Sequence, residues 1–228
     1  MVKKIIVFGF AHSGTTILKS IIGHIDEVDE IYPEQKLIKP EQLKSDKKYI
    51  VCKWPQVLPM FFETAYQDYI KIFIIRDPRW VFSSLNRRDN PKISSKYSLP
   101  VYIENARLFH QFRDSSKVLN LYTIKYEDMF ENNFYNLKKI LNSIGFLYDD
   151  TIFDNTFFTN ISNKSGNEIP QEKPDEKKHG HFRKWQINQP IMNMNDPQKI
   201  DLTEKQRQQI LSSQSILMVY PNINHKNN

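Results

Sequence analysis

The sequence predicts an α/β protein of three layers, in which helices cover both faces of a central parallel sheet. Four short runs of mostly aliphatic and aromatic residues have the composition of buried strands. They are residues 3–10, 48–54, 69–77 and 118–126. Segments typical of helices separate them. Strands that are apolar throughout and alternate with helices are typical of a parallel sheet that is buried on both faces.

The composition indicates one ordinary soluble domain. The chain has 228 residues, 39% of them hydrophobic, which is enough for one core, and we expect residues 1–228 to form a single domain. A single cysteine, Cys52, cannot form an intramolecular disulfide, and we expect it to be a small core residue of a strand. No apolar stretch is long enough to span a bilayer, and the apolar start runs into a glycine loop instead of a cleavage site. We therefore expect a cytoplasmic protein.

The first predicted unit is a strand, a glycine loop and a helix. The strand closes at Gly9, and the helix after the loop has apolar residues at helical spacing: Ile17, Leu18, Ile21, Ile22 and Ile25. After the third predicted strand, Asp77 can cap a helix that Pro78 opens.

Three longer helices are predicted after residue 98. Residues 99–117 and 126–146 have amphipathic patterns, and the second is predicted to stop near Gly145. Thr203 and Gln206 have the spacing of a capping box, which predicts a helix that begins there and continues to about residue 220.

The segment from about Ser162 to Pro190 breaks this alternation. It is polar, poor in aliphatic residues and longer than the usual connection in a compact domain, so it is either a disordered linker or a lid over a ligand. We favour the lid, because Phe182 and Trp185 would have no use in a solvated tether.

The loop Gly9–Thr16, G-F-A-H-S-G-T-T, predicts an anion site. Its glycines have Walker A spacing, but Thr15 stands where that motif has its phosphate-binding lysine. A turn from strand to helix directs backbone N–H groups and the positive end of the helix dipole at an anion, with or without the lysine. A single phosphate group suits this loop better than a triphosphate.

Arg76 argues against magnesium-dependent phosphoryl transfer. P-loop kinases usually hold the ion with an acidic residue at a neighbouring strand end, whereas the run of residues 71–75 is followed by arginine. The next residue, Asp77, is better explained as a helix cap. An arginine at this place would bind a second anion.

Three motifs together resemble those of the PAPS-dependent sulfotransferases, where PAPS is 3′-phosphoadenosine 5′-phosphosulfate. Residues 11–16 resemble the 5′-phosphosulfate loop of that family. Arg76 and Ser84, eight positions apart, resemble its 3′-phosphate motif, and residues 178–185 resemble its late lid motif. The resemblance implies a P-loop NTPase-like fold and transfer of a sulfuryl group from PAPS to a hydroxyl or amine. The product is the bisphosphate PAP, and no metal is needed.

The resemblance also assigns donor-binding residues. Those expected at the 5′ end are Ala11, His12, Ser13, Gly14, Thr15 and Thr16. Arg76 and Ser84 are expected at the 3′-phosphate, and Lys178, His179 and Gly180 in the lid.

Three residues are candidates for catalysis. His12 replaces the basic residue that stabilises the departing phosphate in the family; alternatively it is a packing or capping histidine of the loop. Lys53 is a fixed cation for the same charge, or else a surface lysine that ends a strand. The family's catalytic histidine is replaced by Pro55, so Glu34 is the candidate base, although it could equally be an exposed residue of a first helical turn.

Other functions remain open at this point. The acceptor is expected to be a small molecule or a glycan. Its identity cannot be read from the sequence, because a fold does not determine the substrate. A non-catalytic PAP or PAPS sensor is the main alternative, and an ATP-dependent kinase is disfavoured by the missing lysine and acid. A net charge of +6 suits polyanions, but no nucleic-acid motif is present and we expect no nucleic-acid partner. His179 and His181 alone do not indicate a metal site.

Overall fold

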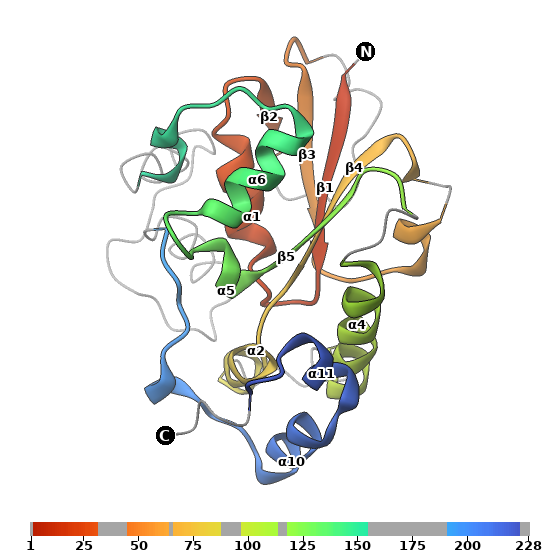
Figure 1. Ribbon diagram of the computed structural model, residues 1–228, viewed down its shortest axis with the longest axis vertical. Helices are drawn as coiled ribbons and strands as arrows, with labels where there is room; N and C mark the ends of the chain where they lie inside the picture. Colours follow the sequence, from red (N-terminus) through yellow and green to blue (C-terminus); the bar gives the residue numbers. More distant parts are fainter. Residues whose placement is uncertain are drawn as a thin grey trace.

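The computed structural model describes residues 2–31, 45–63, 66–87, 97–113, 118–154 and 191–223 (Figure 1). Its centre is a five-stranded parallel sheet with strand order β2-β3-β1-β4-β5. The strands are β1 (Lys3–Gly9), β2 (Val28–Glu30), β3 (Tyr49–Trp54), β4 (Tyr69–Ile75) and β5 (Leu121–Lys125). The predicted parallel sheet is confirmed, and four of its strands coincide with the four apolar runs. The short strand β2 was not predicted, because Val-Asp-Glu contains no apolar run; it forms by pairing with β3.

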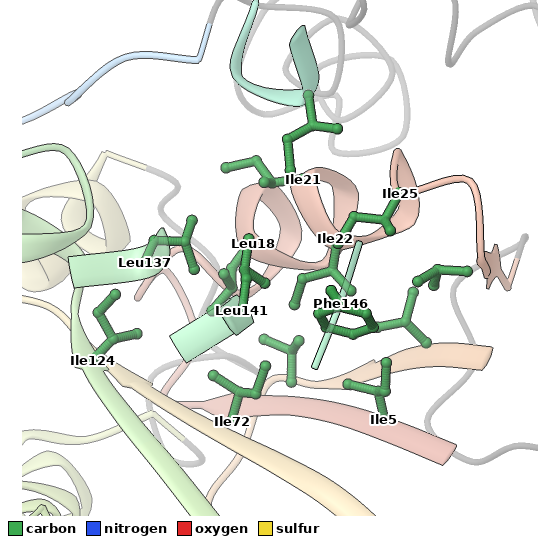
Figure 2. Close-up of a cluster of buried hydrophobic side chains, with 14 of the residues drawn as sticks. Ile5, Leu18, Ile21, Ile22, Ile25, Ile72, Ile124, Leu137, Leu141 and Phe146 are labelled. Atoms are coloured by element: carbon green, nitrogen blue, oxygen red, sulfur yellow. The ribbon is translucent and has the colours of Figure 1, made fainter. Parts of the chain in front are cut away.

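Helices cover both faces of the sheet, as predicted. In Figure 1, α1 (Thr15–Gly23) and α6 (Tyr135–Ile144) lie to the left of the strands. Their side chains pack on one face in a cluster that includes Leu18, Leu141 and Ile72 (Figure 2). The opposite face is covered by α2 (Pro78–Asn86), α4 (Leu99–Phe112), α10 (Glu204–Ser212) and α11 (Gln214–Val219). The three-layer α/β/α architecture is therefore confirmed.

Local signals placed several helix ends correctly. The Asp77 side chain accepts a hydrogen bond from the Arg79 N–H and caps α2, and Gly145 ends α6 in the left-handed conformation. Thr203 and Gln206 form the predicted capping box at the start of α10. Cys52 is buried in β3, where desolvation raises the pKa of its thiol to about 12, so its interpretation as a core residue is also confirmed.

Two of the long predicted helices are in fact broken. The predicted helix 126–146 is divided into α5 (Tyr126–Met129) and α6 by three consecutive residues with positive φ, Asn132, Asn133 and Phe134. The predicted helix 203–220 is interrupted at Ser213, whose backbone is extended, so that α11 can turn onto α4. Each prediction was wrong because apolar periodicity continues across a turn that reorients the chain.

The connection from β3 to β4 also differs from the expected helix. Among its described residues, the helical positions are 3₁₀ and none is α-helical; the 3₁₀ turn at Pro59–Phe62 buries Phe61 against the sheet. Within the described ranges, none of the helices has both the length and the apolarity that a membrane span requires.

Gly9, at the end of β1, lies so close to β4 that a side chain there is expected to destabilise the protein. A Cβ atom there would overlap the backbone carbonyl oxygen of Ile74 on β4, which cannot move without disturbing the strand. Gly9→Ala is therefore expected to lower the free energy of unfolding by about 3 kcal/mol. Gly145→Ala is the control: its Cβ would meet no atom within 4 Å, so only the positive φ is penalised, by about 1 kcal/mol. Urea unfolding of both variants measures the difference, and equal losses would contradict the close contact.

Candidate functional site

The predicted anion loop joins β1 to α1 at the carboxyl edge of the sheet. Gly14 is the N-cap of α1 with φ 93°, and no side chain of the described residues caps the first turn, which leaves its N–H groups open to an anion within this part of the chain. Gly14 also has no room for a side chain, because a Cβ atom would overlap the ring of Tyr126. Within the described residues, the buried hydroxyl of Ser13 has no hydrogen-bond partner. The loop therefore combines open backbone donors with an unsatisfied buried hydroxyl.

Lys53 reaches this loop from the neighbouring strand. Its position on β3 is paired with Val7 of β1, and its Nζ donates a hydrogen bond to Oγ1 of Thr16 in the first turn of α1. Only 4% of the residue is exposed, so the alternative of a surface lysine at a strand end is wrong. A buried ammonium group directed at a helix N-terminus adds positive charge where the loop already favours an anion.

His12 brings the loop and the second predicted anion site together. Its Nδ1 lies 2.8 Å from Oγ of Ser84 on α2, with the direction of the hydrogen bond depending on the tautomer. Its main-chain oxygen accepts a hydrogen bond of 3.2 Å from Nη1 of Arg76. Arg76 and Ser84, expected from sequence at the 3′-phosphate, thus both contact His12, which is expected at the 5′ end of the donor.

The Arg76 side chain is held in place, and two of its N–H groups are not used by the residues that hold it. Its guanidinium lies 4.3 Å from the ring centroid of Tyr126, and Nε and Nη2 both donate to Oδ1 of Asn195, at 2.8 and 2.7 Å. With the bond to His12, three of its five N–H groups are used. One hydrogen on Nη1 and one on Nη2 have no partner among the described residues. These two are suited to a bidentate contact with a phosphate.

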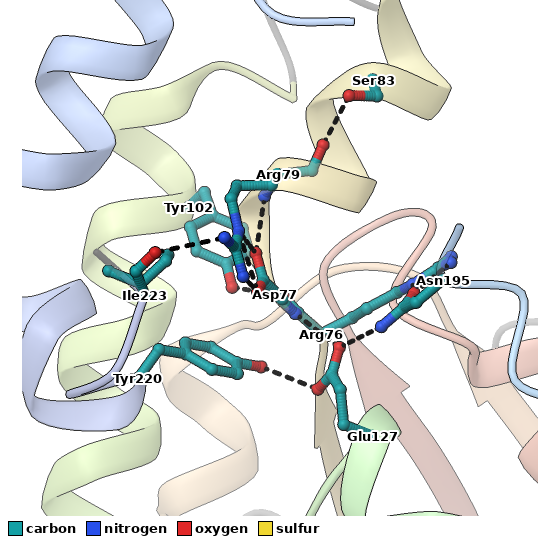
Figure 3. Close-up of polar contacts among 9 residues, drawn as sticks. All are labelled: Arg76, Asp77, Arg79, Ser83, Tyr102, Glu127, Asn195, Tyr220 and Ile223. Carbon is teal, nitrogen blue, oxygen red and sulfur yellow. Dashed lines mark hydrogen bonds and ion pairs between the residues drawn. The ribbon is translucent and has the colours of Figure 1, made fainter. Parts of the chain in front are cut away.

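Behind Arg76 lies a buried polar network centred on Glu127 (Figure 3). Its Oε1 accepts from the Asp77 N–H at 3.0 Å and from Nδ2 of Asn195 at 2.9 Å, and its Oε2 accepts from the Tyr220 hydroxyl at 3.3 Å. Burial raises the pKa of the Glu127 carboxyl, although the bond from the Asp77 N–H opposes that rise. Burial, together with the nearby Glu127 carboxylate, raises the pKa of the Tyr220 hydroxyl well above its ordinary value.

Asp77 has a structural function, as the sequence indicated. Besides capping α2, its carboxylate forms a buried ion pair with Arg79, with 2.6 Å between Oδ2 and Nη2. Arg79 also donates to the main-chain oxygen of Ile223 and so ties the end of the described chain to α2. In the part of the chain that the structure describes, no cluster of three or more His, Cys, Asp or Glu side chains could hold a metal ion.

Sequence reasoning missed three residues of this site. Tyr126 and Glu127 follow β5 directly, where the sequence predicted only the start of the helix 126–146. Their place at the end of a parallel strand next to β4 was a usable signal, because the carboxyl ends of such strands meet at one edge. Asn195 had no such signal: it lies in an irregular segment, and only its contacts with Arg76 and Glu127 identify it.

The remaining predicted residues divide into two groups. Ala11, Ser13 and Thr15 are buried in the loop, with Thr16 beside Lys53. Four others lie outside the described residues, as does the predicted lid at 162–190: Glu34, Lys178, His179 and Gly180.

Comparison with known proteins relates the whole chain to one fold. No protein-family model matches the sequence, and no curated protein matches it. The crystal structure of mouse sulfotransferase SULT7A1 complexed with PAP is similar over 98% of this chain and 89% of that one, with 16% identity and a TM-score of 0.59. A retinol dehydratase in complex with androsterone and PAP covers 86% of this chain and 83% of its own, with 12% identity and a TM-score of 0.42, too low to add to the assignment. The chain therefore has a sulfotransferase fold, as the resemblance of its motifs implied.

Proposed function

We propose that the protein is a sulfotransferase that transfers a sulfuryl group from PAPS to a hydroxyl or amine of a small-molecule or glycan acceptor and releases PAP. The observation that carries this proposal is the contact of both Arg76 and Ser84 with His12 of the anion loop. Two anion sites that meet at one residue suit a ligand with two separate phosphate groups. The PAP in the SULT7A1 structure supports the same class of ligand.

The anion loop is the proposed site of the 5′-phosphosulfate. The open N–H groups at the start of α1 and the buried Ser13 hydroxyl can donate to its oxygens. The hydroxyls of Thr15 and Thr16 lie in the same first turn, and Lys53 adds a cation through its contact with Thr16. These groups suit one esterified phosphate better than a triphosphate with its metal ion.

Arg76 and Ser84 form the proposed site of the 3′-phosphate. Arg76 offers one hydrogen on each terminal nitrogen, and its orientation is fixed by Tyr126 and Asn195. Ser84 offers a hydroxyl that contacts His12 in this structure. A planar arginine that is already oriented loses little side-chain entropy when it binds a phosphate.

In the proposed reaction the acceptor oxygen or nitrogen attacks sulfur. The bond from sulfur to the bridging oxygen of the donor breaks, the sulfuryl group passes to the acceptor, and the acceptor gives up one proton. Negative charge grows on the departing 5′-phosphate, as it does on the leaving group in phosphoryl transfer. Lys53 and a protonated His12 are the groups proposed to stabilise it. Glu34 stays the predicted base, from the sequence alone.

Nucleotide selectivity tests the proposal. PAP should stabilise the protein more than AMP does, because only PAP carries the 3′-phosphate that Arg76 and Ser84 would bind. The difference is expected to be about 1.5–3 kcal/mol, the contribution of hydrogen bonds to a charged group. Thermal shifts at matched ligand concentrations measure it, with ATP and magnesium as a third arm.

Two further results would separate the alternatives. Equal stabilisation by PAP and AMP would contradict the donor assignment, and a larger shift with ATP and magnesium would favour a kinase. If PAP is preferred, incubation with PAPS and a panel of phenols, alcohols, amines and saccharides should yield PAP with at least one of them. The complete absence of transfer would favour a non-catalytic PAP-binding protein.

A further inference from the structure

We propose that Asn195 is a positioning residue that orients Arg76 for the 3′-phosphate and prevents a direct ion pair between Arg76 and the buried carboxylate of Glu127. This inference rests on the proposed function, because it assigns a role within the 3′-phosphate site. It concerns a residue from a distant part of the chain, 119 positions after Arg76.

The Asn195 amide lies between a cation and an anion and contacts both. Its Oδ1 accepts two hydrogen bonds from Arg76, from Nε at 2.8 Å and from Nη2 at 2.7 Å. Its Nδ2 donates to Oε1 of Glu127 at 2.9 Å (Figure 3). The neighbours therefore fix the orientation of the amide, because only an oxygen can accept from the guanidinium and only an N–H can donate to the carboxylate.

This arrangement keeps Glu127 from neutralising Arg76. A carboxylate commonly binds the Nε–Nη2 edge of an arginine in a bidentate ion pair, yet Asn195 occupies that edge and Glu127 forms no ion pair with Arg76. The Glu127 oxygens are instead satisfied by the Asp77 N–H, the Tyr220 hydroxyl and the Asn195 amide. The carboxylate of Asp77, the next residue along the chain, is itself paired with Arg79.

The same segment also fixes the aromatic ring against which Arg76 packs. The Tyr126 hydroxyl donates to the main-chain oxygen of Met192 at 3.2 Å and accepts from the Met194 N–H at 3.1 Å. Met192 and Met194 thus hold the ring on one side of the guanidinium, and Asn195 is the acceptor at its edge. What remains available on Arg76 is the pair of hydrogens on Nη1 and Nη2, with the positive charge intact. A neutral acceptor orients the guanidinium without adding a negative charge that would oppose a phosphate.

The isosteric change Asn195→Asp tests this inference. It keeps the shape of the side chain but places a carboxylate on Arg76 and a second one against Glu127. We expect the preference for PAP over AMP to fall by about 10- to 100-fold, with AMP affinity nearly unchanged. Asn195→Ala removes the contact without adding charge and should lower the preference by only about three- to tenfold. Calorimetric dissociation constants for PAP and AMP give the ratio, and urea unfolding verifies that each variant is folded.

A matched control lies two residues away. Asn193 is exposed, and its Oδ1 accepts from the Asn195 N–H, a bond that an aspartate oxygen can also accept. Asn193→Asp adds the same formal charge to the same segment and should leave the PAP preference within about twofold, because an exposed charge is screened by solvent.

The outcomes separate this inference from the proposed function. If the parent protein shows no preference for PAP, the donor assignment fails and the role of Asn195 fails with it. If the parent prefers PAP and Asn195→Asp retains that preference, the inference is overturned while the proposed function stands. If the aspartate variant does not fold, an unchanged preference in Asn195→Ala overturns the inference equally. A loss of the same size in Asn193→Asp would overturn the inference, because any negative charge in this segment would then lower the PAP preference, whether or not it replaces the Asn195 amide.

Discussion

Replacing Lys53 with methionine is expected to slow single-turnover sulfuryl transfer by about 10²- to 10³-fold, the usual loss when one stabilising donor is removed from a developing oxyanion. The lysine is buried at the end of β3, and its Nζ is held by the Thr16 hydroxyl in the turn that is proposed to hold the 5′-phosphosulfate. Methionine fills nearly the same volume without the charge. PAP affinity should fall by much less than the rate, because charge accumulates on the departing phosphate mainly in the transition state.

Lys71 offers a matched control for this substitution. It is also buried, in the middle of β4, and its Nζ has no partner among the described residues. Burial lowers the pKa of its ammonium group, so Lys71→Met should leave the transfer rate unchanged and unfold at the same or a higher urea concentration. Equal losses of rate in both variants would indicate a general effect of removing a buried lysine. An unchanged rate in Lys53→Met would remove Lys53 from the mechanism.

The sheet could be predicted because buried strands leave local signals, and the parallel arrangement predicts which strand ends share an edge. Buried parallel strands are short apolar runs, and the chain contains four clear ones. The carboxyl ends of parallel strands lie at one edge, and because β1 and β4 are adjacent in the sheet, His12 and Arg76, which follow them, are in contact. The two glycines of the loop are needed because a Cβ atom at either would overlap a neighbour, and Gly14 also has a positive φ.

What the sequence did not reveal depends on contacts between distant segments. Nothing near Asn195 indicates that its amide separates Arg76 from Glu127, because that role exists only when three segments meet. The break between α5 and α6 was missed because a left-handed turn that ends in Phe134 has no glycine to mark it. That residues 1–228 form a single domain, and that 162–190 acts as a lid, stay predictions.

The His12 variants test the position at which this chain departs most from the proposed family. His12→Gln should lower single-turnover transfer by about 10²-fold while leaving PAP affinity nearly intact, because glutamine can contact Ser84 but cannot carry a positive charge. His12→Arg should preserve or increase the rate. An imidazole is cationic only toward the acidic side of neutrality, whereas arginine is always charged. Single-turnover rates of the parent and both variants, measured from mildly acidic to mildly basic pH, test this difference in charge.

The pH comparison distinguishes charge from packing at His12. A histidine that only packs against Ser84 would be replaced by glutamine without loss of rate at any pH from mildly acidic to mildly basic. In that case Lys53, already directed at the loop through Thr16, would have to stabilise the departing phosphate alone. A His12→Gln variant that loses PAP affinity but keeps its rate at saturating donor would instead place His12 in ground-state binding, since an interaction made equally in both states changes affinity without acting on the chemical step. The expected loss of rate with affinity retained is the one result that assigns His12 to the leaving phosphate.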